Sequence, residues 1–503
     1  MTTLSELLPA GGGGNIIDFI ASGTLPNGGR VILKSNGQVE AVAGSGSAQA
    51  IPLGSKHAFT TAADVTNTSI AFDPNNANKF VVSCYFDASG GISRGRIVAG
   101  TVSGSSISFG SVVEFRNNVI STTIVSFDPN TSGKFILVYK DYSNNNYGTC
   151  RVCTLSGNTI SLGAAIVFYS AAITLSTRSA AYNPNVANQF VVAYRATGGN
   201  GSGRAKIGVV SGTSISFSGE NIFNGLVGNT TNISWDPNTT NRFLVVFQDG
   251  SNSNKGTARV GTIGNNDIPY GSKFLFNGTV TDDIVVTADP NTANKYIITY
   301  RNQGNSNYGT SIIASVAGTN ISYGSAVVYN SSQVVSQIHA ADPSNSGKFV
   351  VVYKDVSSPA NLLSARVGTV SGTSVSFETE IVWNGAANGD NLDIAFDPNT
   401  SGKFAISYRD FGSTSGSIML GQISTVVTNL TATNFLGTST AAYTNGQTAT
   451  IMLQGGVSTN QSSLTIGSTY YIQPNGTLAT SAGIPSVIAG KAVKANTLLL
   501  KGI

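Results

Sequence analysis

The chain repeats one pattern seven times, at intervals of 53 or 55 residues. In each repeat an apolar run ends in an Asp-Pro-Asn turn, which reads Asn-Pro-Asn in the third repeat and Asp-Pro-Ser in the sixth. A lysine and a β-rich run closing on an aromatic residue follow in most repeats. A fixed period of this size predicts units that bury their apolar faces only by stacking on one another. The turns start at Asp73, Asp128, Asn183, Asp236, Asp289, Asp342 and Asp397.

Each repeat contains four short runs rich in Val, Ile, Phe and Tyr, separated by Asn, Gly, Ser and Pro, which predicts four β-strands. In the second repeat the predicted strands are residues 124–127, 135–139, 149–155 and 160–168. The turn has a physical basis: Asp accepts a backbone hydrogen bond, Pro fixes φ, and Asn tolerates unusual φ. We therefore interpret the seven turn residues as turn formers rather than catalytic acids.

The last strand of each unit indicates how the array ends. Six repeats carry a nine-residue strand that closes on an aromatic residue, at 107–115, 160–168, 215–223, 268–276, 321–329 and 375–383. The seventh repeat breaks off at Ser424, whereas residues 51–59 match the missing strand. A strand taken from the far end is useful only if the first and last units are neighbours. The sequence thus predicts an all-β fold, a seven-bladed β-propeller over 51–424 closed by an N-terminal strand.

Composition limits the functions open to this chain. Only 10% of residues are charged, and the formal net charge is +4, against about 25% charged in ordinary globular proteins. No Lys/Arg cluster indicates nucleic acid, no apolar run is long enough to insert in a membrane, and the start does not look like a secretory signal. Cys150 and Cys153 lie three apart in a predicted strand and so face opposite ways, which argues against a metal or redox pair. We expect no cofactor and no metal.

The two ends of the chain have a different pattern from the repeats. Residues 19–50 and 425–503 contain short strand-like runs separated by Asn-Gly turns. Because a closed ring brings its two ends together, we expect these segments to join in one small split β-barrel-like domain. Residues 1–18 contain four consecutive glycines and are predicted to be a flexible tether; a disordered tail is the alternative.

The end segments carry a resemblance. Their order is Ser-Glu-Leu-Leu-Pro-Ala-Gly-Gly-Gly-Gly, then Gly-x-Leu-x-Asn-Gly, then Leu-Thr-x-Gly-x-x-Tyr-Tyr and a closing Ala-Gly-Lys-Ala. This resembles virion structural proteins of tailed bacteriophages, of the marine and cyanobacterial phage type, including tail fibres. The resemblance covers about a quarter of the chain. It implies a virion protein that contacts other virion proteins through its ends, with Leu4, Leu7 and Leu8 as anchoring residues. We expect a homotrimer, as in many fibres. We also expect the protein to be made in the host cytoplasm and to be located in the virion, where the resemblance does not distinguish the capsid from the tail.

One edge of the predicted ring has variable loops rich in Tyr, Asn, Ser and Gly, which are typical of adaptable binding loops. Neutral amides and hydroxyls beside aromatic rings also suit a host-surface glycan. The alternative is that Asn, Gly and Ser are ordinary turn residues, and Trp383 occupies the aromatic position found in every repeat. The candidate ligand-binding residues are Tyr142, Asn144, Asn145, Tyr147, Asn254, Asn305, Asn307, Tyr308 and Trp383.

The pattern of charged residues suggests a structural role for them rather than a catalytic one. Asp141, Asp249 and Asp355 co-occur with Arg151, Arg259 and Arg366 in the same repeats, which suggests cross-strand ion pairs. Neither histidine lies in a nucleophile motif, and few carboxylates are placed for glycoside hydrolysis. The sequence thus predicts a non-enzymatic fibre or decoration protein that binds host glycan. The alternatives are a mainly structural capsid decoration and a virion-associated polysaccharide depolymerase.

Overall fold

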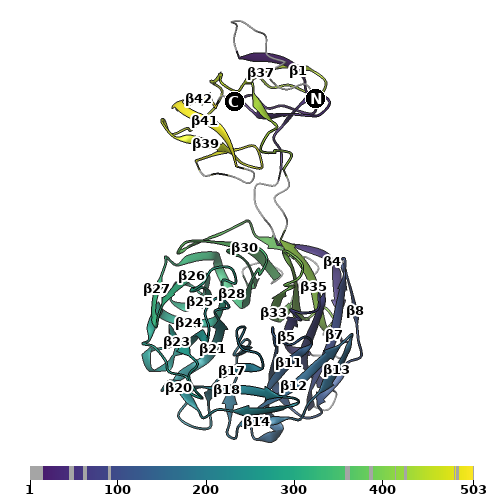
Figure 1. Ribbon diagram of the computed structural model, residues 1–503, viewed down its shortest axis with the longest axis vertical. Coiled ribbons are helices and arrows are strands. Elements are labelled where there is room, and N and C mark those ends of the chain that lie inside the picture. The colour runs from purple at the N-terminus through teal and green to yellow at the C-terminus, as the bar shows by residue number, and fades with distance from the viewer. Residues whose placement is uncertain are drawn as a thin grey trace. The chain divides into compact units, whose positions relative to one another are not determined.

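The computed structural model describes residues 15–44, 50–60, 65–88, 92–356, 363–383, 389–413, 415–423, 428–480, 482 and 486–501. The chain forms two compact units, Gln49–Ile423 and a second built from Met1–Ala48 with Ser424–Ile503 (Figure 1). Leu4, Leu7 and Leu8 lie outside the described residues. Residues 16–18, predicted to belong to the tether, instead lie in strand β1.

The larger unit consists of antiparallel sheets that succeed one another around a ring (Figure 1). No α-helix occurs among the described residues, so the all-β prediction is confirmed. In chain order the strands of the first three repeats are β5 (Val65–Phe72), β6 (Lys79–Ala88), β7 (Ile92–Ser103), β8 (Ser106–Phe109), β9 (Val113–Arg116), β10 (Ile120–Phe127), β11 (Lys134–Asp141), β12 (Tyr147–Ser156), β13 (Thr159–Leu162), β14 (Ile166–Tyr169), β15 (Ile173–Thr174), β16 (Ala180–Tyr182), β17 (Gln189–Ala196), β18 (Gly203–Ser211), β19 (Ser214–Phe217) and β20 (Asn221–Asn224).

The remaining repeats follow the same order, with two long strands, β24 and β28, that each run from the outer edge of one repeat to the centre of the next. Short 3-10 turns η2 (Tyr142–Asn144), η3 (Gly250–Asn252) and η4 (Gln303–Asn305) connect second and third strands. The strands are β21 (Val227–Trp235), β22 (Arg242–Asp249), β23 (Lys255–Thr262), β24 (Phe274–Ala288), β25 (Lys295–Asn302), β26 (Tyr308–Ala317), β27 (Asn320–Tyr323), β28 (Val327–Ala341), β29 (Lys348–Asp355), β30 (Leu363–Ser371), β31 (Ser374–Phe377), β32 (Ile381–Val382), β33 (Gly389–Phe396), β34 (Lys403–Asp410) and β35 (Ser415–Ile423).

The outer strand of the repeats differs from the prediction. The nine-residue strand expected at 321–329, for example, is interrupted between β27 and β28, although both parts pair with β26. Gly324 lies at the interruption, where a Cβ atom would be 1.8 Å from the carbonyl oxygen of Thr373 in the next repeat. At this position the neighbouring hairpin approaches the backbone so closely that only glycine leaves room for it.

Strand β4 (Ala50–Ala58) closes the ring. It pairs antiparallel with β35, with Ile51 opposite Gln422 and His57 opposite Ile418. The predicted pairing of the N-terminal strand with the seventh repeat is therefore confirmed. One apolar cluster joins Ala405, Ile418 and Leu420 of the last repeat to Ile70 and Phe72 of the first, and β33 and β5 lie side by side (Figure 1).

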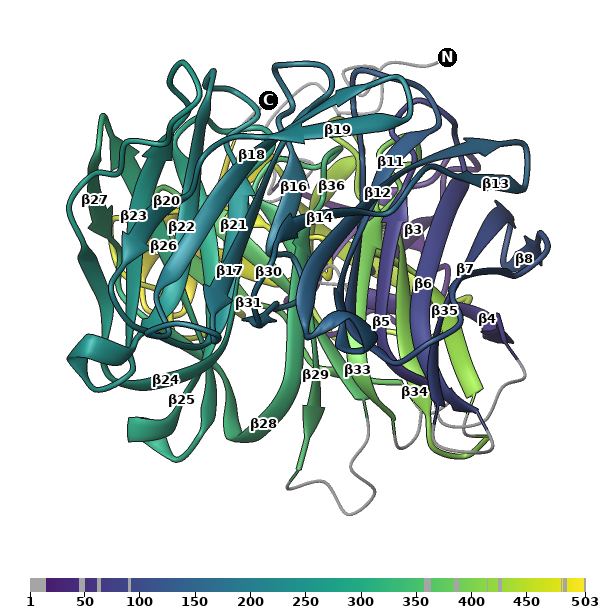
Figure 2. The ribbon, with the colours of Figure 1, turned by 90° about the horizontal axis from the view of Figure 1, so that it is seen from below.

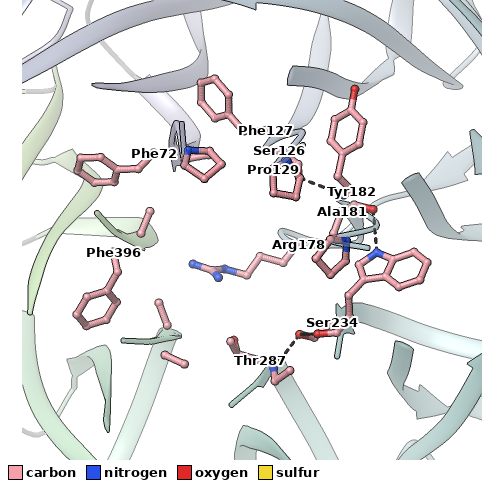
Figure 3. A pocket seen from close by; sticks show the side chains of 18 of the residues that line it. Phe72, Ser126, Phe127, Pro129, Arg178, Ala181, Tyr182, Ser234, Thr287 and Phe396 are labelled. Carbon is pink, nitrogen blue, oxygen red and sulfur yellow. Dashed lines mark hydrogen bonds between the residues drawn. The ribbon is translucent and has the colours of Figure 1, made fainter. Parts of the chain in front are cut away.

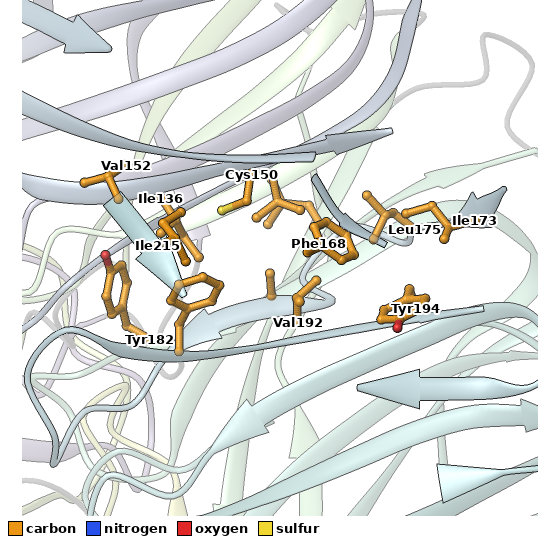
Figure 4. Close-up of a cluster of buried hydrophobic side chains, with 14 of the residues drawn as sticks. Ile136, Cys150, Val152, Phe168, Ile173, Leu175, Tyr182, Val192, Tyr194 and Ile215 are labelled. Carbon is orange, nitrogen blue, oxygen red and sulfur yellow. The ribbon is translucent and has the colours of Figure 1, made fainter. Parts of the chain in front are cut away.

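Apolar clusters fill the space between successive repeats. Figure 4 shows the cluster between the second and third repeats, where Cys150 and Phe168 face Tyr182 and Tyr194. Cys153 belongs to the cluster on the opposite side of the same sheet. Both cysteines are buried and free, as is Cys84, and burial raises the pKa of the Cys153 thiol to about 12. The prediction that Cys150 and Cys153 point to opposite faces is confirmed.

The smaller unit combines strands from both ends of the chain, as predicted. One sheet has the order β1-β37-β36-β2-β3 and the other β38-β42-β41-β39-β40. Ile32, Phe435 and Ile472 share one apolar cluster, so the two sheets pack on a common core. The strands are β1 (Ile16–Ile20), β2 (Arg30–Leu33), β3 (Val39–Ala41), β36 (Phe435–Ser439), β37 (Thr448–Leu453), β38 (Val457–Ser458), β39 (Thr469–Ile472), β40 (Leu478–Ala479), β41 (Val487–Lys494) and β42 (Thr497–Leu500).

Candidate functional site

The ring has two edges, between which its strands run (Figure 2). We call the edge that carries the Asp-Pro-Asn turns the turn edge. The opposite edge, which carries η2, η3 and η4, is the loop edge. The first strand of each repeat, the inner strand, starts at the loop edge: Ile120 of β10 lies opposite Asp141, the last residue before η2.

At the turn edge, all seven turns make the expected hydrogen bond. The Oδ1 atom of the first turn residue accepts from the backbone N–H two residues later, at 2.9 to 3.0 Å. In addition, Oδ2 of Asp128 accepts from the N–H of Asn188 in the next repeat at 2.9 Å. The prediction that these residues form turns is confirmed, and several also connect neighbouring repeats.

The third residue of the turn connects repeats as well. Its side-chain amide donates to the carbonyl oxygen of the turn proline in the next repeat, and the last of these bonds runs from Asn399 back to Pro74 at 3.4 Å. Ser344 replaces asparagine in the sixth turn, and no such bond is present there among the described residues. The other bonds are Asn75 to Pro129, Asn130 to Pro184, Asn185 to Pro237, Asn238 to Pro290 and Asn291 to Pro343.

The axis of the ring holds two cavities. The one at the turn edge has a volume of about 430 Å³ and is lined by the turn prolines and by aromatic residues such as Phe72, Phe127 and Phe396. Figure 3 looks into this cavity, with Arg178 extending across its centre. The lining is mostly apolar, and the charged residues among the described lining residues are Arg178 and Asp393.

Arg178 spans the axis to the opposite side of the ring. Its Nη2 atom lies 2.9 Å from Oδ1 of Asp393, and it also donates to the carbonyl of Ile394. Asp393 is buried and accepts in addition from the backbone N–H of Ile70 at 2.9 Å. Because Thr177 and Leu392, the residues just before these two, line the second cavity, the ion pair separates the two cavities.

The second cavity, which we call the mouth cavity, lies at the loop edge and has a volume of about 270 Å³. Every repeat contributes to it the residue six positions before the turn, and in every repeat this residue is polar. We call these seven residues the mouth ring: Asn67, Thr122, Thr177, Thr230, Asp283, Ser336 and Asn391.

The mouth ring is held in an unusual backbone conformation. Five of its members have φ between 45° and 53°, the left-handed region that side chains other than glycine rarely adopt. Bonds between repeats stabilise this geometry: Oδ1 of Asn67 accepts from the N–H of Thr123 at 2.8 Å, and Thr68 donates to the carbonyl of Asn391 at 2.8 Å. The ring is therefore preorganised by its neighbours.

Asp283 is the ionisable group of the mouth ring. Its carboxylate lies 3.4 Å from Nε of Arg301, which also binds Asp282. Burial raises the pKa of Asp283 to about 6; the charge of Arg301 opposes this shift and that of Asp282 adds to it. The described acids of the two cavities, Asp283 and Asp393, thus line different spaces and are each paired with an arginine.

The loop candidates lie at the loop edge on separate loops of the second, fourth and fifth repeats. Tyr142 is exposed, with Nζ of Lys140 4.4 Å from its ring centre. Asn145, Asn254 and Asn307 occupy left-handed positions, where asparagine is favoured for backbone reasons. The remaining candidates are exposed or half-buried on the same loops: Asn144, Tyr147, Asn305 and Tyr308.

Two expectations about side chains are wrong. Trp383 is buried, with its indole N–H donating to the carbonyl of Ala50 in the closing strand at 3.1 Å, so it belongs to the core. The proposed aspartate–arginine pairs do not form, because the register places Arg259 opposite Val245, four residues from Asp249. The aspartates instead bind Lys273, Arg116, Asn330 and Ser332, and Arg366 lies near Glu380.

Sequence reasoning missed Arg178, Asn232 and the mouth ring. Asn232 also lines the mouth cavity, is 2% exposed, and its side-chain oxygen has no hydrogen-bond partner in the described structure. A signal for the mouth ring was present in the sequence, since a polar residue recurs six positions before every turn.

The described residues contain no group of three or more His, Cys, Asp or Glu side chains that could hold a metal ion. They also include no helix with the length and apolar character required to cross a membrane.

No protein-family model matches the sequence, and no curated protein matches it. Among solved structures, Sqt1 of Chaetomium thermophilum is 12% identical with a TM-score of 0.45, covering 70% of this chain and 84% of that one. Sqt1 of Saccharomyces cerevisiae is 9% identical with a TM-score of 0.44, covering 74% and 99%. The NanB sialidase of Streptococcus pneumoniae is 10% identical with a TM-score of 0.40, covering 74% and 70%. Similarities this distant carry no argument about function.

Proposed function

We propose that this protein is a non-enzymatic virion structural protein of a tailed bacteriophage, a fibre or decoration that attaches to a glycan on the host surface. In this proposal the ring is a seven-bladed β-propeller and the smaller unit is a split barrel-like domain. The pairing of β4 with β35 and the contribution of all seven repeats to both axial cavities support the propeller.

One observation carries the binding function: the loop edge presents uncharged amides, hydroxyls and aromatic rings on loops of fixed shape. In η2, η3 and η4 the same turn is followed by two left-handed residues. The second of these residues, Asn254 for example, accepts at its carbonyl from the N–H of Thr281 in the next repeat at 3.1 Å. Such rigid loops lose little conformational entropy on binding.

The smaller unit supports attachment to other virion proteins. Strand β1 from the N-terminal end pairs with β37 from the C-terminal end, so the two ends of the chain form one folded unit and the ring is inserted between them. In this proposal the smaller unit mediates assembly, both in a homotrimer and in the particle, and the ring contacts the host.

The acids at the axis favour binding over hydrolysis. Glycoside hydrolysis requires two carboxyl groups that flank one bond, whereas Asp283 and Asp393 line different cavities. A depolymerase remains the alternative that Asp283 favours, since its pKa of about 6 would suit a general acid.

A glycan array tests the proposal. We expect the wild-type protein to bind a defined subset of glycans, and Tyr147→Ala and Tyr308→Ala to bind them more weakly because both rings border the loop edge. Incubation with the bound glycan should release no new reducing ends. Release of reducing ends would establish the depolymerase, and absence of any glycan binding would leave the structural capsid decoration.

A further inference from the structure

The mouth cavity combines features that the loops lack. It is lined by residues of all seven repeats, and these residues include an acid, amides and hydroxyls. We propose that the mouth cavity binds a single neutral sugar residue at the end of a glycan chain, an inference that rests on the glycan-binding function proposed above.

Polar groups in the lining match the hydroxyls of a sugar. The carboxylate of Asp283 makes one ion-pair contact, to Arg301 at 3.4 Å, and a carboxylate offers about four acceptor sites. Thr122, Thr177 and Ser336 add hydroxyls that both donate and accept. A sugar presents several hydroxyls that both donate and accept hydrogen bonds, and these lining groups can pair with them.

Charge argues against an ionic ligand. Asp283 is the ionisable residue among the described lining residues, and Arg301 already lies beside it. An anion would meet the carboxylate, and a cation would compete with the guanidinium of Arg301. A neutral ligand avoids both costs.

The closed floor of the cavity selects a chain end. The Arg178–Asp393 ion pair separates the mouth cavity from the second cavity along the axis, and Asp393 is held in addition by the N–H of Ile70. A polysaccharide therefore cannot thread through the ring, and only a terminal residue fits.

Saturation-transfer NMR with the methyl glycosides of glucose, galactose, mannose and N-acetylglucosamine tests this inference in the full-length protein. We expect at least one glycoside to show transfer with the wild type. Thr177→Phe, which fills the cavity, should abolish the signal and weaken glycan-array binding at least ten-fold. Thr177→Ser and Thr213→Phe, which places the same ring on an exposed turn at the other edge, should bind like the wild type.

The outcomes separate the two proposals. If the array shows glycan binding and a folded Thr177→Phe variant binds as tightly as the wild type, the mouth cavity is not the site, although glycan attachment stands. If the wild type binds neither glycan nor glycoside, both proposals fail. Should Thr177→Phe not fold, Ser336→Ala, which removes a hydroxyl from the lining, serves instead; we expect it to weaken binding at least five-fold, and unchanged binding would overturn the inference.

Discussion

At the turn edge, neighbouring repeats are joined by side chains that recur in the sequence, as in the bonds from Asn399 to Pro74 and from Asp128 to Asn188. In the loops η2, η3 and η4 at the loop edge, the corresponding acceptors are backbone carbonyls, as where the carbonyl of Asn307 accepts from the N–H of Val334. Side chains within these three loops can therefore vary without loss of these bonds, while ion pairs such as Arg116–Asp141 join repeats beside the loops. The difference explains why the turns are nearly uniform and the loops diverse, and it places recognition at the loop edge.

The most direct test of this difference between the two edges is to remove one side chain at each edge. Asp236 is buried and accepts from the backbone N–H groups of Asn238 and Asn294. Asp236→Ala leaves these donors unpaired and should lower the free energy of unfolding by about 3 kcal/mol. Tyr142→Ala at the loop edge should change it by about 0.5 kcal/mol at most. Urea denaturation measures both, and equal losses would contradict the division of roles.

Acid should weaken the core between the two edges. His339 on β28 is fully buried, with Nδ1 2.8 Å from the Thr299 hydroxyl. Burial lowers its pKa to about 3, the charge of Arg178 lowers it further, and a backbone contact with Ile297 opposes these effects. Because the folded state takes up its proton less readily than the unfolded chain, stability should fall as the pH drops below about 6.5, by about 2 kcal/mol at pH 5.

The control for this effect is His339→Val, since valine or isoleucine occupies the same position in five other repeats, for example Ile70 and Val125. Denaturation midpoints between pH 7 and pH 5 should fall less in His339→Val than in the wild type. A parallel decline in the two proteins would show that His339 does not carry the acid sensitivity.

The turn-edge bond between the last and first repeats should contribute as much to stability as the same bond between two internal repeats. Asn399→Ala removes the bond to Pro74, and Asn130→Ala removes the same bond to Pro184. Each should cost about 1 kcal/mol in unfolding free energy. Thermal unfolding compares the two variants, and a loss confined to Asn130→Ala would indicate that the first and last repeats are not joined in this way.

The smallest effect should come from restoring the missing bond. Ser344→Asn gives the sixth turn the residue found in the other turns and should gain about 0.5 kcal/mol through a bond to Pro398. Ser344→Ala is the matched control, and a thermal midpoint no higher than that of the control would refute the gain.

The repeat made much of the ring predictable. The turn bonds and the pairing of residues 51–59 with the last repeat follow from local turn chemistry and from counting strands. The broken outer strand could not be predicted, because Gly324 is forced by the carbonyl of Thr373 in another repeat. The aspartate–arginine pairs failed because pairing depends on register, which sequence co-occurrence does not specify.

The candidate site was predicted only in part. The sequence indicated the loop edge. It also placed Trp383 there, because the sequence pattern does not distinguish an aromatic residue on the surface from one in the core. The mouth ring was missed because its members lie in separate repeats and meet only around the axis.

Ring closure is the central claim, since the mouth cavity exists only if the first and last repeats are neighbours. Ile51 and Gln422 are opposite each other across β4 and β35, and antiparallel partners lie about 4.5–5.5 Å apart at Cα, within reach of a disulfide. Mild oxidation of monomeric Ile51→Cys/Gln422→Cys should yield a peptide that links the two positions by mass spectrometry. Ile51→Cys/Thr262→Cys, with the second cysteine at the equivalent place in the fourth repeat, should give none. Failure of the first pair to link, or linking of the second, would contradict the closed ring.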